Sequence, residues 1–298
     1  MKKLFIYLPI LFLVISLASC GEDLDTENSV FDDSLIKEKT DFDRWLDKYY
    51  VKPYNIQILY NYVDIETDFD YDLVPADLEK SKSLSILAKY LWIEPYEEYM
   101  GMAFFRTYAP RVLQYIGNPG WKSNNSIILG TAETGVKIAL WNVNNLNMND
   151  PSTYLRYIKT MHHEYAHIFQ QQKITDPLFD QITPEVYVGD NWTGSTDLAA
   201  YRSGCVSTYA ASSPIEDFVE IYSIFVTNTP EYWNNMLTAA STNADGSPCS
   251  GANYIRQKFD IVADYYKNSW GIDIYKMREI VNRRKTEILT LDLNSLYK

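Results

Sequence analysis

The sequence predicts an α+β domain in which a mixed β-sheet lies beside one long helix and a mainly helical lobe follows. Three observations predict this class. Short β-branched and aromatic segments lie upstream of residue 150, the segment 151–172 has apolar residues at helical spacing, and amphipathic segments follow it. About 260 residues from position 41 onward fit one large domain or two tightly joined lobes, so we expect a single domain at 41–298.

Residues 1–19 have the layout of an export signal. Lys2 and Lys3 precede an apolar run from 4 to 17 that is too short to anchor the chain in a bilayer. The run ends in Leu-Ala-Ser before Cys20, which resembles a bacterial lipobox and implies cleavage before Cys20 and lipid attachment to it. The alternative is an ordinary secretory signal in which Cys20 is incidental.

The chain is acidic, which bears on its partners. The net charge is −12, and removal of Lys2 and Lys3 changes it to 25 − 39 = −14. This balance argues against nucleic acid as a partner and against adhesion to anionic lipid, so we expect contact with the membrane only through the N-terminal lipid. Residues 20–40 form a predicted flexible acidic tether. Its cluster at 21–27 resembles Bacteroidetes-type lipoproteins exported to the cell surface, with a merely solvated, periplasm-facing tether as the alternative.

Upstream of residue 150 we expect alternating helices and strands. Helices are predicted at 41–50, 76–92 and 104–116, and strands at 55–63, 126–129 and 135–143. Pro75 precedes the second helix, and the turn residues 117–120 end the third. A Gly-containing loop would join the last two strands. We expect residues 136–143 to form the sheet edge that borders the cleft.

The segment 151–172 is the most strongly predicted helix. Asp150 offers an N-cap and Pro151 occupies the first helical position. Apolar residues recur at 155, 158, 161, 165 and 168, which predicts that one side of this helix is packed. Two further helices are predicted at 254–267 and 274–288, separated by Trp270 and Gly271.

All three histidines of the chain fall within residues 162–167, in the pattern His163-Glu164-x-x-His167. On a helix, His163 and His167 project from the same face and can bind one metal ion. Glu164 is turned by about 100° from His163, so it can stand beside the metal and reach a water. The pattern is typical of zinc hydrolases. The alternatives are an accidental match, or a former site that is now structural.

A catalytic zinc needs a third protein ligand, and the chain has no further histidine to supply one except His162, whose different direction predicts a packing role. The metzincin extension after His167 is absent, and no Cys-x-x-Cys pair occurs. A carboxylate from the amphipathic segment 214–222 is the best donor, on a helix packed against the first. Cys205 and Cys249 could form a disulfide in an exported protein, and their spacing does not decide it.

The acidic residues of the segment 214–222 are spaced as in the gluzincin metallopeptidases, which the sequence resembles here. In those enzymes a downstream helix gives a glutamate ligand, and an acid four residues later supports a ligand histidine. The resemblance implies that Glu216 binds zinc and that Glu220 hydrogen-bonds an imidazole N–H and fixes its orientation. The reverse assignment stays open. Asp217 points elsewhere on such a helix and is expected to face solvent.

A closer resemblance is to the Bacteroidetes zinc-binding metallopeptidase lipoproteins associated with substrate import. It rests on the lipobox, the segments 53–56, 130–135 and 203–210, the His-Glu helix and the Glu216 segment. It implies a zincin-like, gluzincin-type fold, a zinc ion (Zn²⁺), and a TonB-dependent importer and a surface lipoprotein as partners. Tyr209 lies seven residues before Glu216, where related lethal-factor-type gluzincins carry a catalytic tyrosine that stabilises an oxyanion. The alternative for Tyr209 is a packed loop residue.

These observations predict a zinc metallopeptidase of the cell envelope that cleaves peptide or protein substrates with Glu164 as general base. Its location is expected to be the outer membrane, in association with nutrient import. One alternative is a binding lipoprotein of an import complex without enzymatic activity. The other is a zinc hydrolase that acts on non-peptide amide bonds.

Overall fold

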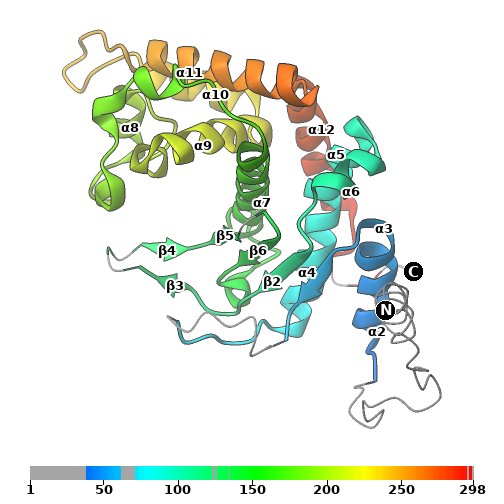
Figure 1. Ribbon diagram of the computed structural model, residues 1–298. Coiled ribbons are helices and arrows are strands. Elements are labelled where there is room, and N and C mark those ends of the chain that lie inside the picture. The colour runs from blue at the N-terminus through cyan, green and yellow to red at the C-terminus, as the bar shows by residue number, and fades with distance from the viewer. Residues whose placement is uncertain are drawn as a thin grey trace, which may run out of the picture. The chain divides into compact units, whose positions relative to one another are not determined.

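The computed structural model describes residues 38–61, 71–122, 124, 126–133, 135–293 and 295–296 (Figure 1). Residues 1–40 and Asp41–Lys298 are two separate units, and the second is described by itself. The export signal, Cys20 and nearly all of the acidic tether lie outside the described residues. In the described ranges, no helix combines the length and the apolar character needed to cross a membrane.

A four-stranded mixed sheet forms the base of the unit Asp41–Lys298, in the strand order β1-β2-β6-β5. Its strands are β1 (Gln57–Leu59), β2 (Val112–Tyr115), β5 (Gly130–Glu133) and β6 (Lys137–Leu140). The first three strands in spatial order are parallel, and β5 is antiparallel to β6, with Thr131 opposite Ala139. A separate hairpin pairs β3 (Gly120–Trp121) with β4 (Ile127–Ile128). The mixed sheet agrees with the predicted α+β class.

Two predictions around the sheet are wrong. The helix expected at 104–116 is α6 (Met102–Tyr108) followed by strand β2. Pro110 explains the change, since it forces Ala109 into an extended conformation (ψ 144°) and cannot continue a helix. The predicted edge, 136–143, is also wrong, because β6 lies inside the sheet. The edge strand next to β6 is β5, which was expected to be part of a loop and turns into β6 at Gly135 (φ +72°).

Helix α7 (Pro151–Gln172) has the predicted bounds. The Asp150 side chain accepts a hydrogen bond from the backbone N–H of Ser152, and Pro151 occupies the first turn, so the N-terminus is capped as expected. The helix contacts β5 and β6 along one side and helix α9 (Pro214–Thr227) along another. The His-Glu pattern therefore lies between the edge of the sheet and a second helix.

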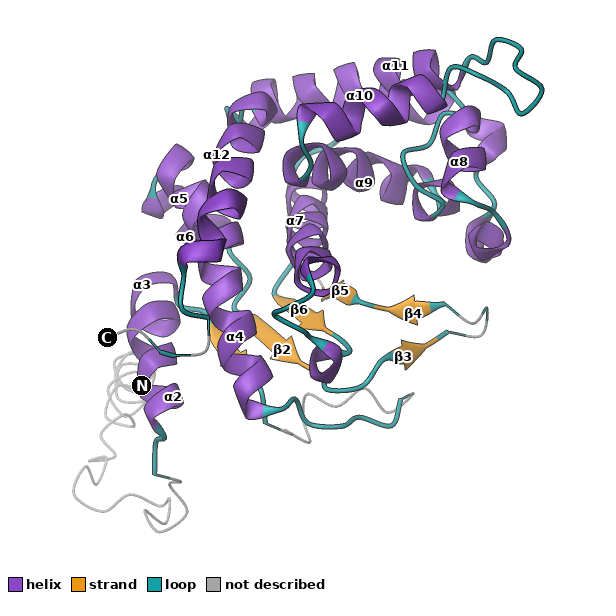
Figure 2. Ribbon diagram, turned by 180° about the vertical axis from the view of Figure 1, so that it is seen from behind, coloured by secondary structure: helices purple, strands orange, loops and turns teal. Residues whose placement is uncertain are grey.

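The other helices complete a mainly helical unit. They are α2 (Asp41–Leu46), α3 (Lys52–Tyr54), α4 (Leu78–Ala88), α5 (Glu94–Met100), α8 (Asp197–Ser203), α10 (Pro230–Ala239), α11 (Gly251–Tyr265) and α12 (Ile274–Glu287). Three short π-helical stretches, η2 (Asp47–Val51), η4 (Lys89–Ile93) and η10 (Tyr266–Trp270), extend α2, α4 and α11. Figure 2 shows α9, α10 and α11 on one side of α7 and the sheet on the other.

Aromatic side chains fix the inner face of α7. Tyr165 and Phe169 on α7 contact each other at a ring distance of 4.6 Å, and Tyr165 packs edge-on against Tyr96 and Trp92. All four side chains are buried. Because one face of α7 is anchored in this way, its opposite face holds the histidines in a defined direction.

Candidate metal centre

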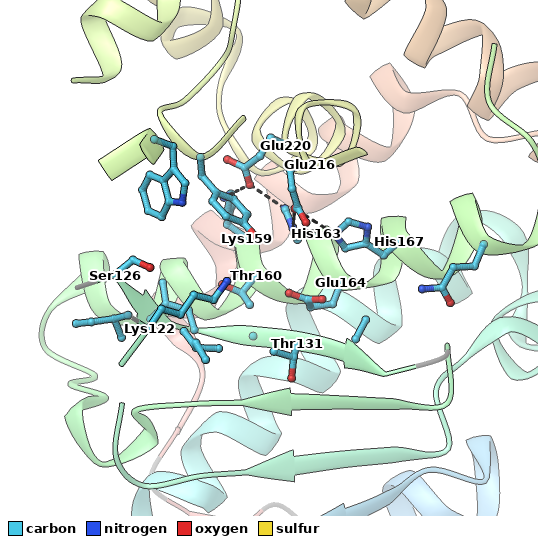
Figure 3. Close-up of a pocket in the computed structure, with 18 residues that line it drawn as sticks. Lys122, Ser126, Thr131, Lys159, Thr160, His163, Glu164, His167, Glu216 and Glu220 are labelled. Carbon is cyan, nitrogen blue, oxygen red and sulfur yellow. Dashed lines mark hydrogen bonds and ion pairs between the residues drawn. The ribbon is translucent and has the colours of Figure 1, made fainter. Parts of the chain in front are cut away.

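Three donor atoms from two helices converge at one point (Figure 3). The Nε2 atom of His163 lies 3.1 Å from Oε2 of Glu216, the Nε2 atom of His167 lies 3.3 Å from the same oxygen, and the two Nε2 atoms are 3.2 Å apart. Donors at about 2.05 Å in a tetrahedron around zinc are about 3.3 Å from one another. The three donors therefore already have the spacing that a zinc ion requires, and two imidazoles with one carboxylate are a donor set that zinc accepts.

The start of α9 positions Glu216. Pro214 occupies the first turn, and the hydroxyl of Ser213 accepts a hydrogen bond from the backbone N–H of Glu216. The packing of α9 on α7 then directs the Glu216 carboxylate at the two histidines. The structure thus brings His163, His167 and Glu216 together as a possible metal cluster.

Glu220 supports the centre from behind His163. One of its oxygens accepts a hydrogen bond from Nδ1 of His163 at 2.8 Å and pairs with the Lys159 ammonium, and the other accepts from the Ser207 hydroxyl at 2.6 Å. Glu216 faces the Nε2 atoms of both histidines, whereas Glu220 contacts only the far side of one ring. This geometry favours Glu216 over Glu220 as the metal ligand, in the order that the resemblance implied.

Two supporting residues were missed in the sequence. Lys159 lies four positions before His163 on α7, a spacing that places both side chains on one helix face and was a readable signal. Ser207 lies in the loop before α9 and reaches Glu220 only through the tertiary fold. Together they hold Glu220 in place, so the orientation of His163 depends on residues from three segments.

The two carboxylates that face His163 favour a proton on its ring. Burial lowers the pKa of this histidine, but the hydrogen bonds to Glu216 and Glu220 outweigh it and raise the pKa to about 9. For Glu220, burial opposes ionisation, yet Lys159 and His163 lower its pKa to about 2. The pKa of Glu216 is held well below its usual range by the two imidazoles, against the effect of burial. The carboxylates are therefore ionised and ready to bind a cation.

Glu164 stands beside the donor cluster without joining it. Its side chain points from α7 toward β5 and lines the cavity described below (Figure 3). Only 5% of it is exposed, and burial raises the pKa of its carboxyl group, while His163 and His167 act in the opposite direction. A carboxylate with a raised pKa next to a metal site is suited to accept a proton.

Tyr209 borders the same site. It begins the short helix η9 (Tyr209–Ser212), and its ring lies 5.8 Å from that of His163 and packs against Trp192 at 5.2 Å. Burial and the carboxylates of Glu216 and Glu164 raise the pKa of the phenol well above its usual range. Tyr209 therefore keeps its proton and can donate a hydrogen bond into the site.

His162 packs away from the donor cluster, in the direction predicted for it. It is fully buried, its Nε2–H donates to the backbone carbonyl of Leu91 at 3.1 Å, and its Nδ1 lies 3.2 Å from the hydroxyl of Tyr96. Burial lowers the pKa of His162 to about 4, so the ring is neutral and Nδ1 accepts from Tyr96. Tyr96 in turn accepts from Tyr222 on α9, at 2.7 Å.

Asp217 does not face solvent, contrary to expectation. It is fully buried, pairs with the Lys258 ammonium of α11 at 2.6 Å and accepts a hydrogen bond from Tyr187. The expectation failed because α11 covers the face of α9 on which Asp217 lies. Cys205 and Cys249, the two cysteines that the structure describes, are free thiols, and the Cys249 thiol donates to the backbone carbonyl of Arg202.

A cavity of about 470 Å³ opens onto the donor cluster. Its walls are the hairpin strand β4, the edge strand β5, the outer face of α7, and the segment that carries Trp192 and Tyr209. The lining includes Glu164, the three residues of the candidate metal cluster, Glu220 and the two lysines Lys122 and Lys159. The centre is thus open on the side where an exchangeable ligand or a substrate would enter.

Comparison with known proteins agrees with this centre. Residues 36–275 match the model of the family described as "Putative zinc-binding metallo-peptidase". The chain belongs to this family. The match confirms the predicted family, and the family description names zinc as the bound metal, which the donor set found here fits.

A solved structure with the same description as the family is similar to this chain over nearly its whole length. It is the crystal structure described as that of a "putative zinc-binding metallo-peptidase" from Bacteroides caccae ATCC 43185. The sequence identity is 37%, the similarity covers 90% of this chain and 100% of that chain, and the TM-score is 0.71. No curated protein matches the chain.

Proposed function

We propose that this member of the metallopeptidase family is a zinc-dependent peptidase of gluzincin type. Its ligands are His163, His167 and Glu216, and its general base is Glu164. The observation that carries the proposal is the convergence of the three donor atoms at spacings of 3.1–3.3 Å beside a buried carboxylate, at the wall of an open cavity. A closed structural site would use a fourth protein ligand and would need no base.

The residues divide the reaction between them. Bound at the three donors, zinc supplies a Lewis acid that polarises a carbonyl and lowers the pKa of a water. Glu164 takes the proton from the attacking water and passes it to the leaving amine. Tyr209 donates a hydrogen bond to the oxyanion that forms on the scissile carbonyl. Glu220 keeps the His163 ring in the tautomer whose Nε2 lone pair faces the centre.

Strand β5 provides a surface for an extended peptide. It is an edge strand of the sheet, and its residues Gly130, Thr131 and Ala132 line the cavity beside Glu164. A peptide could add to this edge through main-chain hydrogen bonds, which would place one of its carbonyls near the centre. This strand takes the role that residues 136–143 were expected to have.

The location of the protein is part of the proposal and is supported by the N-terminal sequence. The lipobox at Cys20 and the acidic residues after it favour attachment to the outer membrane through lipid, with the peptidase domain at the cell surface or in the periplasm. In that place it would supply peptides for uptake by a TonB-dependent importer and its partner lipoprotein.

The metal assignment is tested by zinc content measured by mass spectrometry on the purified chain lacking residues 1–20. We expect about one zinc per chain in wild type and in Glu164→Gln, little in Glu216→Ala, and a partial loss in Glu220→Ala. Glu231→Ala, at an exposed position on α10, is the matched control and should leave the zinc content unchanged. Loss of metal in Glu164→Gln would show that Glu164 is itself a ligand.

The activity is tested on a peptide library and, in parallel, on acetylated sugars and other non-peptide amides. Zinc-dependent cleavage of peptides that disappears in Glu164→Gln supports the peptidase. Turnover of only the non-peptide amides would favour the second class of zinc hydrolase. Zinc binding with no turnover of either set would favour a binding lipoprotein.

A further inference from the structure

We propose that Lys122 makes the cavity selective for substrates that carry a carboxylate close to the scissile bond. The inference rests on the proposed function, because it names the class of peptide that the same site would take. The carboxylate can come from an acidic side chain or from the C-terminus of a short peptide. Its recognition would take place at the end of the cavity formed by the β3–β4 hairpin.

The first step is the placement of Lys122. It follows Trp121 at the end of β3, and its backbone N–H donates to the carbonyl of Ser126 at 3.0 Å, which fixes its position in the hairpin. Its side chain is among those that line the cavity, and Figure 3 shows it extending past β4 toward Thr160 on α7. The ammonium group is therefore presented to whatever fills the cavity.

The second step is that the charge of Lys122 is uncompensated. Within the part of the chain that the structure describes, no carboxylate forms an ion pair with this ammonium group. The other cavity lysine, Lys159, is different because its charge is committed to Glu220. An exposed lysine needs no partner in water, but one that faces a binding cavity offers its charge to the ligand.

The third step is the charge balance of the cavity. Its carboxylates are Glu164, Glu216 and Glu220, and its cations are Lys122 and Lys159. With a divalent metal at the donors, the wall carries one net positive charge, whereas the chain as a whole carries −12. Lys122 is the group in the lining that no acid offsets. A substrate with an extra carboxylate would complete the balance, and one with an extra ammonium would worsen it.

The strand direction says which side of the scissile bond Lys122 meets. Strand β4 precedes β5 along the chain, and Lys122 lies at the β4 end of the cavity. A peptide that runs antiparallel to this edge has its C-terminal portion at the β4 end. Lys122 would then contact an acidic residue that follows the scissile bond, or a free C-terminal carboxylate a few residues beyond it.

The experiment uses alanine-rich labelled hexapeptides with glutamate, glutamine or lysine at the fourth position, each with a free or an amidated C-terminus. Dissociation constants are measured on the zinc-loaded Glu164→Gln protein, and turnover is measured on wild type. An exposed ammonium–carboxylate pair is worth at most roughly 1 kcal/mol. We therefore expect glutamate to be preferred over glutamine by up to about fivefold, in both binding and kcat/KM. The preference should weaken as salt is raised, because screening acts on exposed charges.

Charge reversal provides the decisive variant. Lys122→Glu should reverse the preference to lysine peptides, with unchanged zinc content and thermal stability, since Lys122 is exposed. Lys52→Glu, an exposed lysine on α3 outside the cavity, should leave the preference as in wild type. The free and amidated peptides tell an acidic side chain from a C-terminal carboxylate.

The inference is overturned if Lys122→Glu binds the three peptides in the same order as wild type. A failure of the proposed function looks different. In that case no peptide is cleaved, the neutral ones included, while the binding preference on the Glu164→Gln protein still decides whether Lys122 selects carboxylates.

Discussion

Substitution of Gly130 by alanine should disturb catalysis by displacing Glu164. A Cβ atom at position 130 would lie 2.4 Å from Cγ2 of Thr160, 2.8 Å from Oε1 of Glu164 and 3.3 Å from its Cγ. Carbon atoms in contact are about 3.4 Å apart or more, so β5 and α7 must separate by about 1 Å. The backbone of Gly130 does not have a positive φ, so the steric contact is the main effect.

The magnitude follows from this displacement. Forcing an extra carbon into a packed contact costs about 1–3 kcal/mol of unfolding free energy. A catalytic group moved by about 1 Å can lose on the order of 100-fold in rate. Because the donors on α7 and α9 do not contact the new methyl group, we expect near-normal zinc content. Urea unfolding, zinc analysis and kcat on a cleaved peptide measure the three quantities separately.

Two further variants isolate the cause. Gly194→Ala is the matched control, because a Cβ there meets nothing within 4 Å and its properties should stay close to wild type. Adding Thr160→Ser to Gly130→Ala can remove the 2.4 Å contact but leaves the contact with Glu164. Stability should then recover more than kcat. Wild-type kcat in Gly130→Ala would refute the idea that this glycine sets the position of Glu164.

Three more predictions concern charge and protons. Lys258→Met should cost about 3–5 kcal/mol in urea unfolding, because it leaves the buried carboxylate of Asp217 without its partner, and a change below about 0.5 kcal/mol would contradict this. Zinc binding at pH 7.5 should release about one proton, because the pKa of His163 is raised to about 9. Titration calorimetry in two buffers of different ionisation enthalpy measures this release, and a release of no proton would show that the His163 ring is already neutral. Folding lowers the pKa of His162 from 6.5 to about 4, so between these pH values the His162 ring is protonated only in the unfolded chain. The free energy of unfolding of the protein without zinc should therefore decrease by about 3 kcal/mol as the pH falls through this range. His162→Gln should lack this component, and equal pH dependence of the two proteins would contradict it.

The features that were predicted correctly depend on neighbours in sequence. The cap at Asp150, the proline after it and the apolar spacing of α7 are local signals, and the helix has the predicted bounds. The same holds for His163 and His167, whose relative direction is set by one helical turn. Which carboxylate would serve as the third ligand depends on how α9 lies across α7. The choice of Glu216 came from the resemblance to a known family rather than from periodicity, and it stays a prediction.

The features that were missed depend on tertiary pairing. Gly-Thr-Ala-Glu at 130–133 has little intrinsic preference for a strand, and pairing with β6 makes it one. For the segment 104–116, the apolar content suits a helix and a strand equally, and Pro110 was the overlooked signal. The partner of Asp217 lies 41 residues away on α11, beyond the reach of any local rule.

The contact between His162 and Leu91 has a consequence for the backbone of η4. Leu91 lies in the π-helical stretch η4, and the proline at position 95 has no amide hydrogen. The donor that an α-helix would supply four residues after Leu91 is therefore missing, and the imidazole of His162 donates to the Leu91 carbonyl instead. His162 thus acts as a substitute amide. Loss of the His162 ring would therefore mainly destabilise η4 and would affect α7 only indirectly. Restoring a backbone N–H with Pro95→Ala should then partly compensate for His162→Phe, so that two positions far apart in sequence would behave as one hydrogen bond.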